Sequence, residues 1–225
     1  MTAVKATPPV TAPVEDYLKV IFALESAAGV AGTNEIASEL GFAPASVSGM
    51  VRRLAEQGLI THERYRGVKL TKAGRRAALR TIRRHRVIEA YLTTALGYPW
   101  DRVHDEAERL EHAASDELID RMAAAIGEPA TDPHGAPIPT RDGTLADPPL
   151  VALSDVAVGA RVTIERVGDR DAEQLRYLAE VGITPGRVVP GLARAPCDGP
   201  IDLRVGRATR SIGPALAKQI LVAPS

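Results

Sequence analysis

The sequence changes character at Gly127, and this change divides the chain into two differently built halves. Before Gly127, apolar residues recur at the three- and four-residue spacing of α-helices. From Gly127 to Pro149 the chain is rich in proline, glycine, aspartate and threonine without a regular period, which is typical of a linker. Between Val151 and Val222, glycines separate short β-prone runs, and this pattern predicts a small β-barrel.

The region up to Thr71 has the element order of a winged helix-turn-helix. It begins with an expected flexible arm, Met1–Ala12, after which Pro13 suits the first turn of a helix. Two alternating runs surround Tyr65-Arg66-Gly67 and predict a tight hairpin, the wing. The expected helices are Val14–Ser26, Thr33–Leu40 with Thr33 as N-cap, and Ala43–Gln57; the expected strands are Leu59–Arg64 and Val68–Thr71.

The remaining chain predicts three further helices and a set of short strands. The helices are Lys72–Ala95, Asp101–Ala113 and Ser115–Ile126. The strands are Arg161–Val167, Arg187–Leu192, Ile201–Val205, Ala208–Ile212 and Gln219–Val222. The expected domains are a winged helix-turn-helix at 1–73, a helical domain at 74–126, a linker at 127–149 and a small β-barrel at 150–225. The expected fold class is therefore mainly α, followed by a small C-terminal barrel.

Charge is unevenly distributed although the net charge is zero. Between Thr33 and Leu92 there are 12 lysines and arginines against 5 acidic residues, whereas between Asp101 and Ile126 there are 3 against 8. A basic block before an acidic block suits a surface that contacts phosphate and a pocket that holds cations. A solvated charge asymmetry without a function is the alternative interpretation.

In a helix-turn-helix, the start of the second helix enters the major groove, while the wing and nearby basic residues contact phosphates. The residues at this helix start are small, which favours contacts to thymine methyl groups and recognition of DNA shape. The candidate base-contacting residues are Ala43, Pro44, Ala45, Ser46, Ser48 and Gly49. The candidate phosphate-contacting residues are Arg52, Arg53, Arg64, Arg66 and Lys69. We therefore predict DNA binding, although winged helices also serve as protein-interaction modules.

The single cysteine, Cys197, excludes an intramolecular disulfide and fits a reducing compartment. The segment from Met1 to Thr11 carries one lysine and no long apolar run, so no signal peptide is expected. No stretch approaches the length and apolarity that span a bilayer. These features predict a cytoplasmic protein.

Two short helical runs contain three of the five histidines. In the first run, His85 and Glu89 are four residues apart and therefore share one helix face. Each such residue alone is more often a surface or core residue than a ligand, but their combination is typical of a metal site. The second run places four candidate ligands along one stripe: His104, Glu108, Glu111 and His112.

Together with Asp16 in the first helix, these runs resemble the diphtheria-toxin-repressor family of metal-dependent transcriptional regulators, in its manganese-sensing type with a Src-homology-3-like barrel. The resemblance covers nearly the whole chain. It implies a homodimeric repressor with a helical dimerisation domain, which binds operator DNA and takes no small-molecule substrate. The segments that carry it are Asp16-Tyr17-Leu18, Val103-His104-Asp105-Glu106-Ala107, Glu111-His112, Asp132-Pro133-His134-Gly135, Ile138-Pro139 and the run from Leu175 to Ile183.

The resemblance also implies two metal positions in each chain. The primary position would use Asp16, Glu108, Glu111 and His112. The ancillary position would use His85, Glu89 and His104, with Asp171 and Gln174 reaching over from the barrel. Glu173 is an equally available carboxylate beside that last pair.

The donor atoms at the primary position favour manganese. Iron sensors of this family carry a methionine and a cysteine where this chain has Asp16 and Glu108, and oxygen donors suit Mn²⁺ better than sulfur donors do. Short manganese sensors place a carboxylate three residues after Asp16, where this chain has Lys19, which disfavours a close two-metal cluster. We expect a Mn(II)-activated repressor that controls manganese homeostasis; the alternative is an Fe(II)-dependent iron-homeostasis repressor of the same family.

Two other classes of protein are alternatives. A metallohydrolase would keep an open coordination position beside a general base, whereas these carboxylates are expected to serve as ligands, so we do not expect an enzyme. A winged-helix protein that ignores metal, with incidental histidines and glutamates, is the third reading. The barrel is expected to act as a lid on the metal site, a dimer contact or a partner-binding module.

Overall fold

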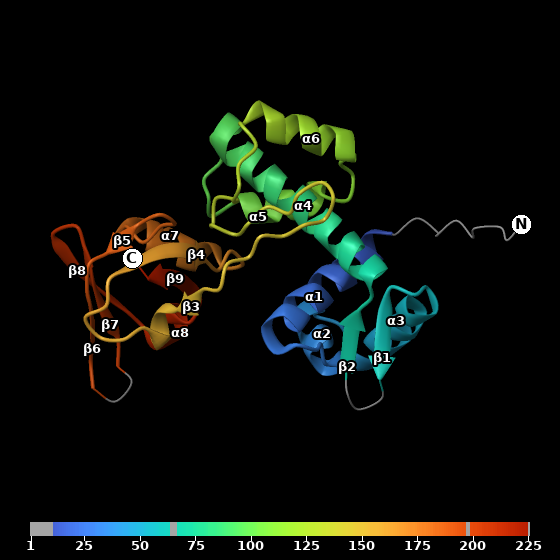
Figure 1. The fold of residues 1–225 in the computed structure, drawn as a ribbon, viewed down its shortest axis with the longest axis horizontal. Coiled ribbons are helices and arrows are strands. Elements are labelled where there is room, and N and C mark those ends of the chain that lie inside the picture. Colours follow the sequence, from blue (N-terminus) through green and yellow to red (C-terminus); the bar gives the residue numbers. More distant parts are fainter. Residues whose placement is uncertain (1–10, 64–66, 197–198, 225) are drawn as a thin grey trace, which may run out of the picture. The chain divides into compact units, whose positions relative to one another are not determined.

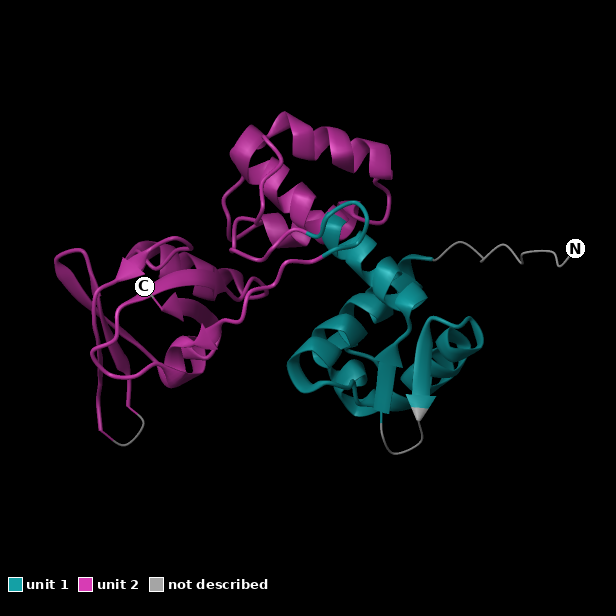
Figure 2. Ribbon diagram, in the orientation of Figure 1, with its two compact units in different colours: residues 1–83, 139–144 teal, residues 84–138, 145–225 magenta. Residues whose placement is uncertain are grey.

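A computed structural model of the chain describes residues 11–63, 67–196 and 199–224. It divides into two compact units, one within residues 1–83 and 139–144 and the other within 84–138 and 145–225 (Figure 2). The long helix α4 (Lys72–Leu96) contributes its first half to one unit and its second half to the other. Most of the predicted arm at Met1–Ala12 lies outside the described residues, as do Cys197 and the wing arginines Arg64 and Arg66.

The first unit is a winged helix-turn-helix, as the sequence predicts (Figure 1). The two strands of the wing pair antiparallel, with Ile60 opposite Leu70 and Glu63 opposite Gly67. The wing is also tied to the helices, because Ala31 and Val68 exchange backbone hydrogen bonds of 3.0 and 2.8 Å, and the Glu25 carboxylate accepts from the Leu70 amide. Its elements are α1 (Ala12–Ala28), α2 (Thr33–Leu40), α3 (Pro44–Glu56), β1 (Ile60–Glu63) and β2 (Gly67–Leu70).

The start of α2 differs from the prediction in one respect. Thr33 is the first helical residue, and Gly32 occupies the N-cap position. The reason is that the Glu35 carboxylate, in the first turn, accepts a 2.9 Å hydrogen bond from the Gly32 amide and so supplies the acceptor that a capping side chain would otherwise provide.

The helical part of the second unit consists of the end of α4 with α5 (Val103–Leu110) and α6 (Asp116–Ala125). The sequence predicts a longer second helix, Asp101–Ala113. The structure ends α5 at Leu110, because the carbonyl of Leu110 accepts from the amides of both Ala113 and Ala114 in a tighter turn. These helices share a small core of aliphatic side chains: Val87, Ile88, Leu92, Val103, Ala107, Ile119 and Ala123.

The rest of the second unit is a small β-barrel of two antiparallel sheets. A four-stranded sheet has the order β3-β9-β4-β5, and a three-stranded sheet has the order β6-β7-β8. The predicted strand Arg187–Leu192 is split in two where Pro190 and Gly191 interrupt it, and the pattern did not predict the helix α7. The elements are β3 (Val151–Ala152), η1 (Leu153–Asp155), β4 (Val162–Val167), α7 (Ala172–Val181), β5 (Val188–Val189), β6 (Leu192–Arg194), β7 (Ile201–Val205), β8 (Ala208–Ile212), α8 (Pro214–Ala217) and β9 (Ile220–Pro224).

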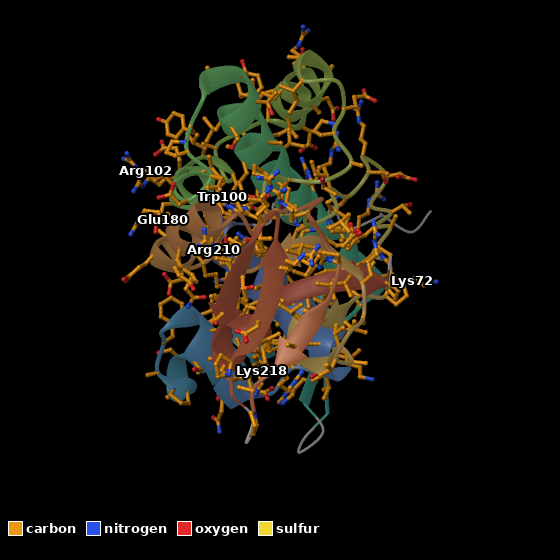
Figure 3. The ribbon with its side chains drawn as sticks, turned by 90° about the vertical axis from the view of Figure 1, so that its left-hand side faces the viewer. Lys72, Trp100, Arg102, Glu180, Arg210 and Lys218 are labelled. Atoms are coloured by element: carbon orange, nitrogen blue, oxygen red, sulfur yellow. The ribbon has the colours of Figure 1, made fainter. Side chains whose placement is uncertain are left out.

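The barrel core extends to Trp100, which precedes α5 and packs against it (Figure 3). The core itself is aliphatic, with Ile164, Leu175, Leu203 and Ile220 fully buried. Among the described residues, no helix is long and apolar enough to cross a membrane.

Candidate metal centre and nucleic-acid interface

The predicted DNA-reading residues form one exposed face at the start of α3. Val47, Val51 and Leu54 point into the core of the first unit, which leaves the intervening residues at the surface. The Ser48 hydroxyl donates to the Pro44 carbonyl across 3.0 Å. The exposed candidates are Ala43, Pro44, Ala45, Ser46, Ser48, Gly49, Arg52, Arg53 and Lys69. Arg64 and Arg66 belong to the wing tip, which lies outside the described residues.

Two helices bring the predicted ancillary ligands together. His85 and Glu89 are one turn apart on α4, and His104 is on α5. His85 Nε2 lies 3.1 Å from Glu89 Oε1 and 3.2 Å from His104 Nδ1, and His104 Nδ1 lies 3.4 Å from the same Glu89 oxygen. Glu89 is fully buried and His85 almost so. The predicted grouping of these three side chains agrees with the structure.

The second-unit members of the predicted primary position lie next to this group. Glu111 and His112 follow α5, and His112 Nε2 lies 3.3 Å from Glu111 Oε1. Glu108, one turn earlier, places a carboxylate oxygen 3.6 Å from His85 Nδ1. His85 Nδ1 also lies 2.7 Å from Glu111 Oε2 and must be the donor there, because a carboxylate only accepts. A neutral His85 ring therefore holds Glu111 with one nitrogen and presents the other to Glu89 and His104.

The fourth predicted primary ligand, Asp16, lies half-buried on α1 in the first unit. Its participation stays a prediction. Lys19 is one turn further along the same helix, as the sequence requires.

The barrel residue beside the histidines is Asp169 rather than the predicted pair. Asp169 Oδ2 lies 3.9 Å from His104 Nδ1. Asp171 instead caps α7: its Oδ1 accepts from the amides of Glu173 and Gln174, and its Oδ2 accepts from the Gln174 side chain. An aspartate three residues before the helix core is a common N-cap, and this signal was available in the sequence.

A histidine that the sequence reasoning did not consider as a ligand also lies here. His134 is buried in the segment that composition assigns to a linker, and its Nδ1 lies 3.8 Å from Glu89 Oε1. Glu89, His134 and Asp169 each offer a ligand atom, and these atoms lie within 4.8 Å of one another. The same holds for His85, His104 and Glu108. The signal was weak, because a lone histidine among prolines and glycines has no helical partner.

The segment around His134 is an ordered turn. Thr131 and Pro137 form an antiparallel bridge, and Asp132 Oδ1 accepts from the amides of His134 and Ala136, both at 2.9 Å. The His134 carbonyl accepts from the Val167 amide at the end of β4. Gly135 has a φ of +90°, and a Cβ there would lie 1.8 Å from the Glu165 carbonyl oxygen. We call residues Thr131–Pro137 the histidine turn.

The electrostatics of this region centre on Glu89. Burial raises the pKa of Glu89, but the adjacent rings of His104 and His85 outweigh it and leave the pKa well below its usual value. Burial lowers the pKa of His104, and the carboxylates of Glu89 and Asp169 reverse this to a net increase. Burial and the charge of Glu89 raise the pKa of Asp132 to about 6, despite the opposing charge of Arg86. The region thus keeps a carboxylate ionised among groups that carry or attract positive charge.

The donor set fits a divalent cation. Neither oxygen of Glu89 has a well-aligned hydrogen-bond donor, and His134 Nδ1 has no partner, although all three atoms are buried. Buried polar atoms without partners are rare because each costs roughly 1–3 kcal/mol. Imidazole nitrogens and carboxylate oxygens are ligands for first-row divalent metals. A cation would satisfy these atoms together.

Three family models match the chain in sequence. The description "Iron dependent repressor, N-terminal DNA binding domain" matches residues 10–68, and "Iron dependent repressor, metal binding and dimerisation domain" matches residues 71–140. The description "FeoA domain" matches residues 151–224, which form the barrel.

Individual relatives include iron- and manganese-named regulators. The iron-dependent repressor IdeR of Mycobacterium leprae is 32% identical over 76% of this chain and 80% of its own length. The HTH-type transcriptional regulator MntR of Lysinibacillus sphaericus is 34% identical over 52% of this chain and 83% of its own length. A solved structure titled "Manganese-dependent transcriptional repressor complex with manganese" is 41% identical, with a TM-score of 0.85 over 94% of this chain and 99% of that one.

Proposed function

The chain belongs to the iron-dependent, or diphtheria-toxin, repressor family of metal-dependent transcriptional repressors, and from this premise we propose that it represses operators in response to Mn(II). The proposal includes binding of double-stranded operator DNA by a cytoplasmic homodimer. The single observation that carries it is the buried group of Glu89 with the histidines that surround it, beside an exposed recognition helix in the same chain.

The proposed primary position combines Asp16 with Glu108, Glu111 and His112. Three carboxylates and one imidazole make an oxygen-rich donor set, which suits Mn²⁺ more than a later transition metal. The proposed ancillary position contains His85, Glu89 and His104. From the barrel, the proximity of Asp169 to His104 supports Asp169 as its ligand in place of Asp171 and Gln174.

The proposed mechanism depends on ligands from both units. Asp16 belongs to the unit that carries α3, whereas Glu108, Glu111 and His112 belong to the helical part of the other unit. A bound cation supplies positive charge that carboxylates from both units can share. The residues themselves restrain α3 and its twin in the dimer to one spacing, which is what a two-fold symmetric operator requires. Each tenfold gain in operator affinity needs about 1.4 kcal/mol of difference between the restrained and unrestrained forms.

Operator binding as a function of Mn²⁺ tests this mechanism. The Asp16→Ala variant is expected to lose at least tenfold of the Mn²⁺-dependent gain in affinity, measured by fluorescence anisotropy on a labelled operator found by footprinting. Glu39→Ala is the matched control, because Glu39 is an exposed acid on α2 of the same unit and its loss removes the same charge.

The two variants separate metal sensing from a general effect of charge on DNA. Glu39→Ala is expected to keep the full Mn²⁺ response. If Asp16→Ala keeps it as well while remaining folded, the proposed mechanism is wrong.

Iron is the second candidate metal. It is favoured by the match to the iron-named family models and to the M. leprae repressor. Operator binding with Mn²⁺ and Fe²⁺ at equal free concentration separates the two candidates, and stronger activation by Fe²⁺ would favour iron homeostasis.

A further inference from the structure

We propose that His134 is a metal ligand of the ancillary position, so that this position contains three imidazoles. The inference rests on the proposed function, because it assumes that a cation binds beside Glu89. It adds a ligand that comes from the histidine turn rather than from the helices or from the barrel.

The hydrogen bonding of His134 determines which ring nitrogen is available. His134 Nε2 lies 2.7 Å from the backbone carbonyl oxygen of Trp100, and a carbonyl only accepts. Nε2 therefore carries the proton, and in the neutral ring Nδ1 carries a lone pair. A histidine that ligates a metal through one nitrogen commonly donates with the other to a backbone carbonyl, which sets its tautomer and its orientation.

The available nitrogen faces the ancillary group. Only 1% of His134 is exposed, and its Nδ1 has no hydrogen-bond partner. Nδ1 lies 3.8 Å from Glu89 Oε1, and a carboxylate oxygen of Asp169 completes the group within 4.8 Å. A structural histidine in the same place would be expected to use both nitrogens in hydrogen bonds. The lone pair instead points to a ligand.

The turn holds the ring in this orientation from several directions. Asp132 accepts from the His134 amide, Val167 donates to the His134 carbonyl, and the Trp100 ring stacks on the imidazole with centroids 5.8 Å apart. Such support from surrounding groups is a feature of ligands that must be ready before the metal arrives.

A third imidazole changes the selectivity of the ancillary position. With His85, His104 and His134 against Glu89 and Asp169, nitrogen donors outnumber side-chain carboxylates. Imidazole suits Fe²⁺, Co²⁺ and Zn²⁺, whereas carboxylate suits Mn²⁺. The two proposed positions thus differ in preference: the oxygen-rich primary position favours Mn²⁺, and the ancillary position accepts later metals better.

The first test counts histidine rings on the metal in the unmodified protein. With ¹¹³Cd²⁺ as the probe, correlation NMR between cadmium and ring protons is expected to show three histidine rings coupled to one cadmium. Two rings on the more nitrogen-rich cadmium would overturn the proposal. This measurement needs no substitution and therefore does not depend on the folding of a variant.

The second test uses His134→Gln, in which the side-chain amide nitrogen can still donate to the Trp100 carbonyl but the Nδ1 lone pair is lost. We expect its ancillary affinity for Co²⁺, measured by calorimetry, to fall at least tenfold while the primary affinity for Mn²⁺ stays within twofold. His62→Gln is the matched control, because His62 is an exposed histidine of the wing. Its affinities are expected to match those of the unmodified protein.

The outcomes distinguish this inference from the proposed function. If the unmodified protein binds neither Mn²⁺ nor Co²⁺, both are wrong. If it binds two ions and His134→Gln binds them with unchanged affinity, His134 is only structural and the proposed function stands.

Discussion

Replacing Gly135 with alanine tests whether the histidine turn is packed as the structure shows. Gly135 has a φ of +90°, and an added Cβ would lie 1.8 Å from the carbonyl oxygen of Glu165 on β4. Gly127 provides a matched control, because it also has a positive φ, of +81°, but no atom lies within 4 Å of the position of its Cβ. The two substitutions therefore share the backbone strain and differ in the steric clash.

The expected magnitudes follow from these two contributions. Positive φ costs an L-residue roughly 1–2 kcal/mol, partly offset by about 0.4–1 kcal/mol because alanine reduces the freedom of the unfolded chain. Gly127→Ala should therefore cost about 0.5–1 kcal/mol of unfolding free energy. Overpacking adds about 1–3 kcal/mol, so Gly135→Ala should cost about 2–4 kcal/mol.

The assay is urea unfolding of the metal-free protein followed by tryptophan fluorescence. Trp100 is the only tryptophan, and it stacks on His134, so the signal reports on the histidine turn itself. If the two variants lose the same stability within about 0.5 kcal/mol, the turn does not pack against β4 and the reasoning is refuted.

Two pH-dependent effects are also expected. The pKa of Asp132 is raised from 3.8 to about 6 in the folded protein, so folding favours its protonated form, and stability is lost as the pH rises through about 6. From pH 7 to pH 5 the metal-free protein should gain about 1 kcal/mol from this group, and Asp132→Asn should lack that gain in urea unfolding at both pH values. The pKa of His104 is also raised, so protons compete longer with a cation, and calorimetric affinity for Co²⁺ should weaken as the pH falls. An affinity independent of pH between 5 and 8 would exclude His104 as a ligand.

The regular elements were predictable because their signals are local. Ile201–Val205 and Ala208–Ile212 agree residue for residue with β7 and β8, since glycines delimit both runs. His85 and Glu89 were predictable as neighbours because helical spacing alone places them on one face. No such spacing relates Asp169 or His134 to His104, because loops and the packing of the barrel bring them together.

The cap of α7 shows the same limit from the other side. Asp171 was assigned to the metal through the family pattern, whereas its side chain serves the helix start through the amides of Glu173 and Gln174. Competition between a backbone cap and a distant ligand set is decided by three-dimensional distance, which a sequence pattern does not contain.

The imidazole of His85 belongs to both proposed positions at once. One of its nitrogens is anchored on Glu111, and the other is turned to Glu89 and His104. Occupancy of either position must therefore reorient or brace a group used by the other, so the chain cannot count its two ions independently. A regulator wired in this way responds to metal supply over a narrower concentration range than two separate sensors would.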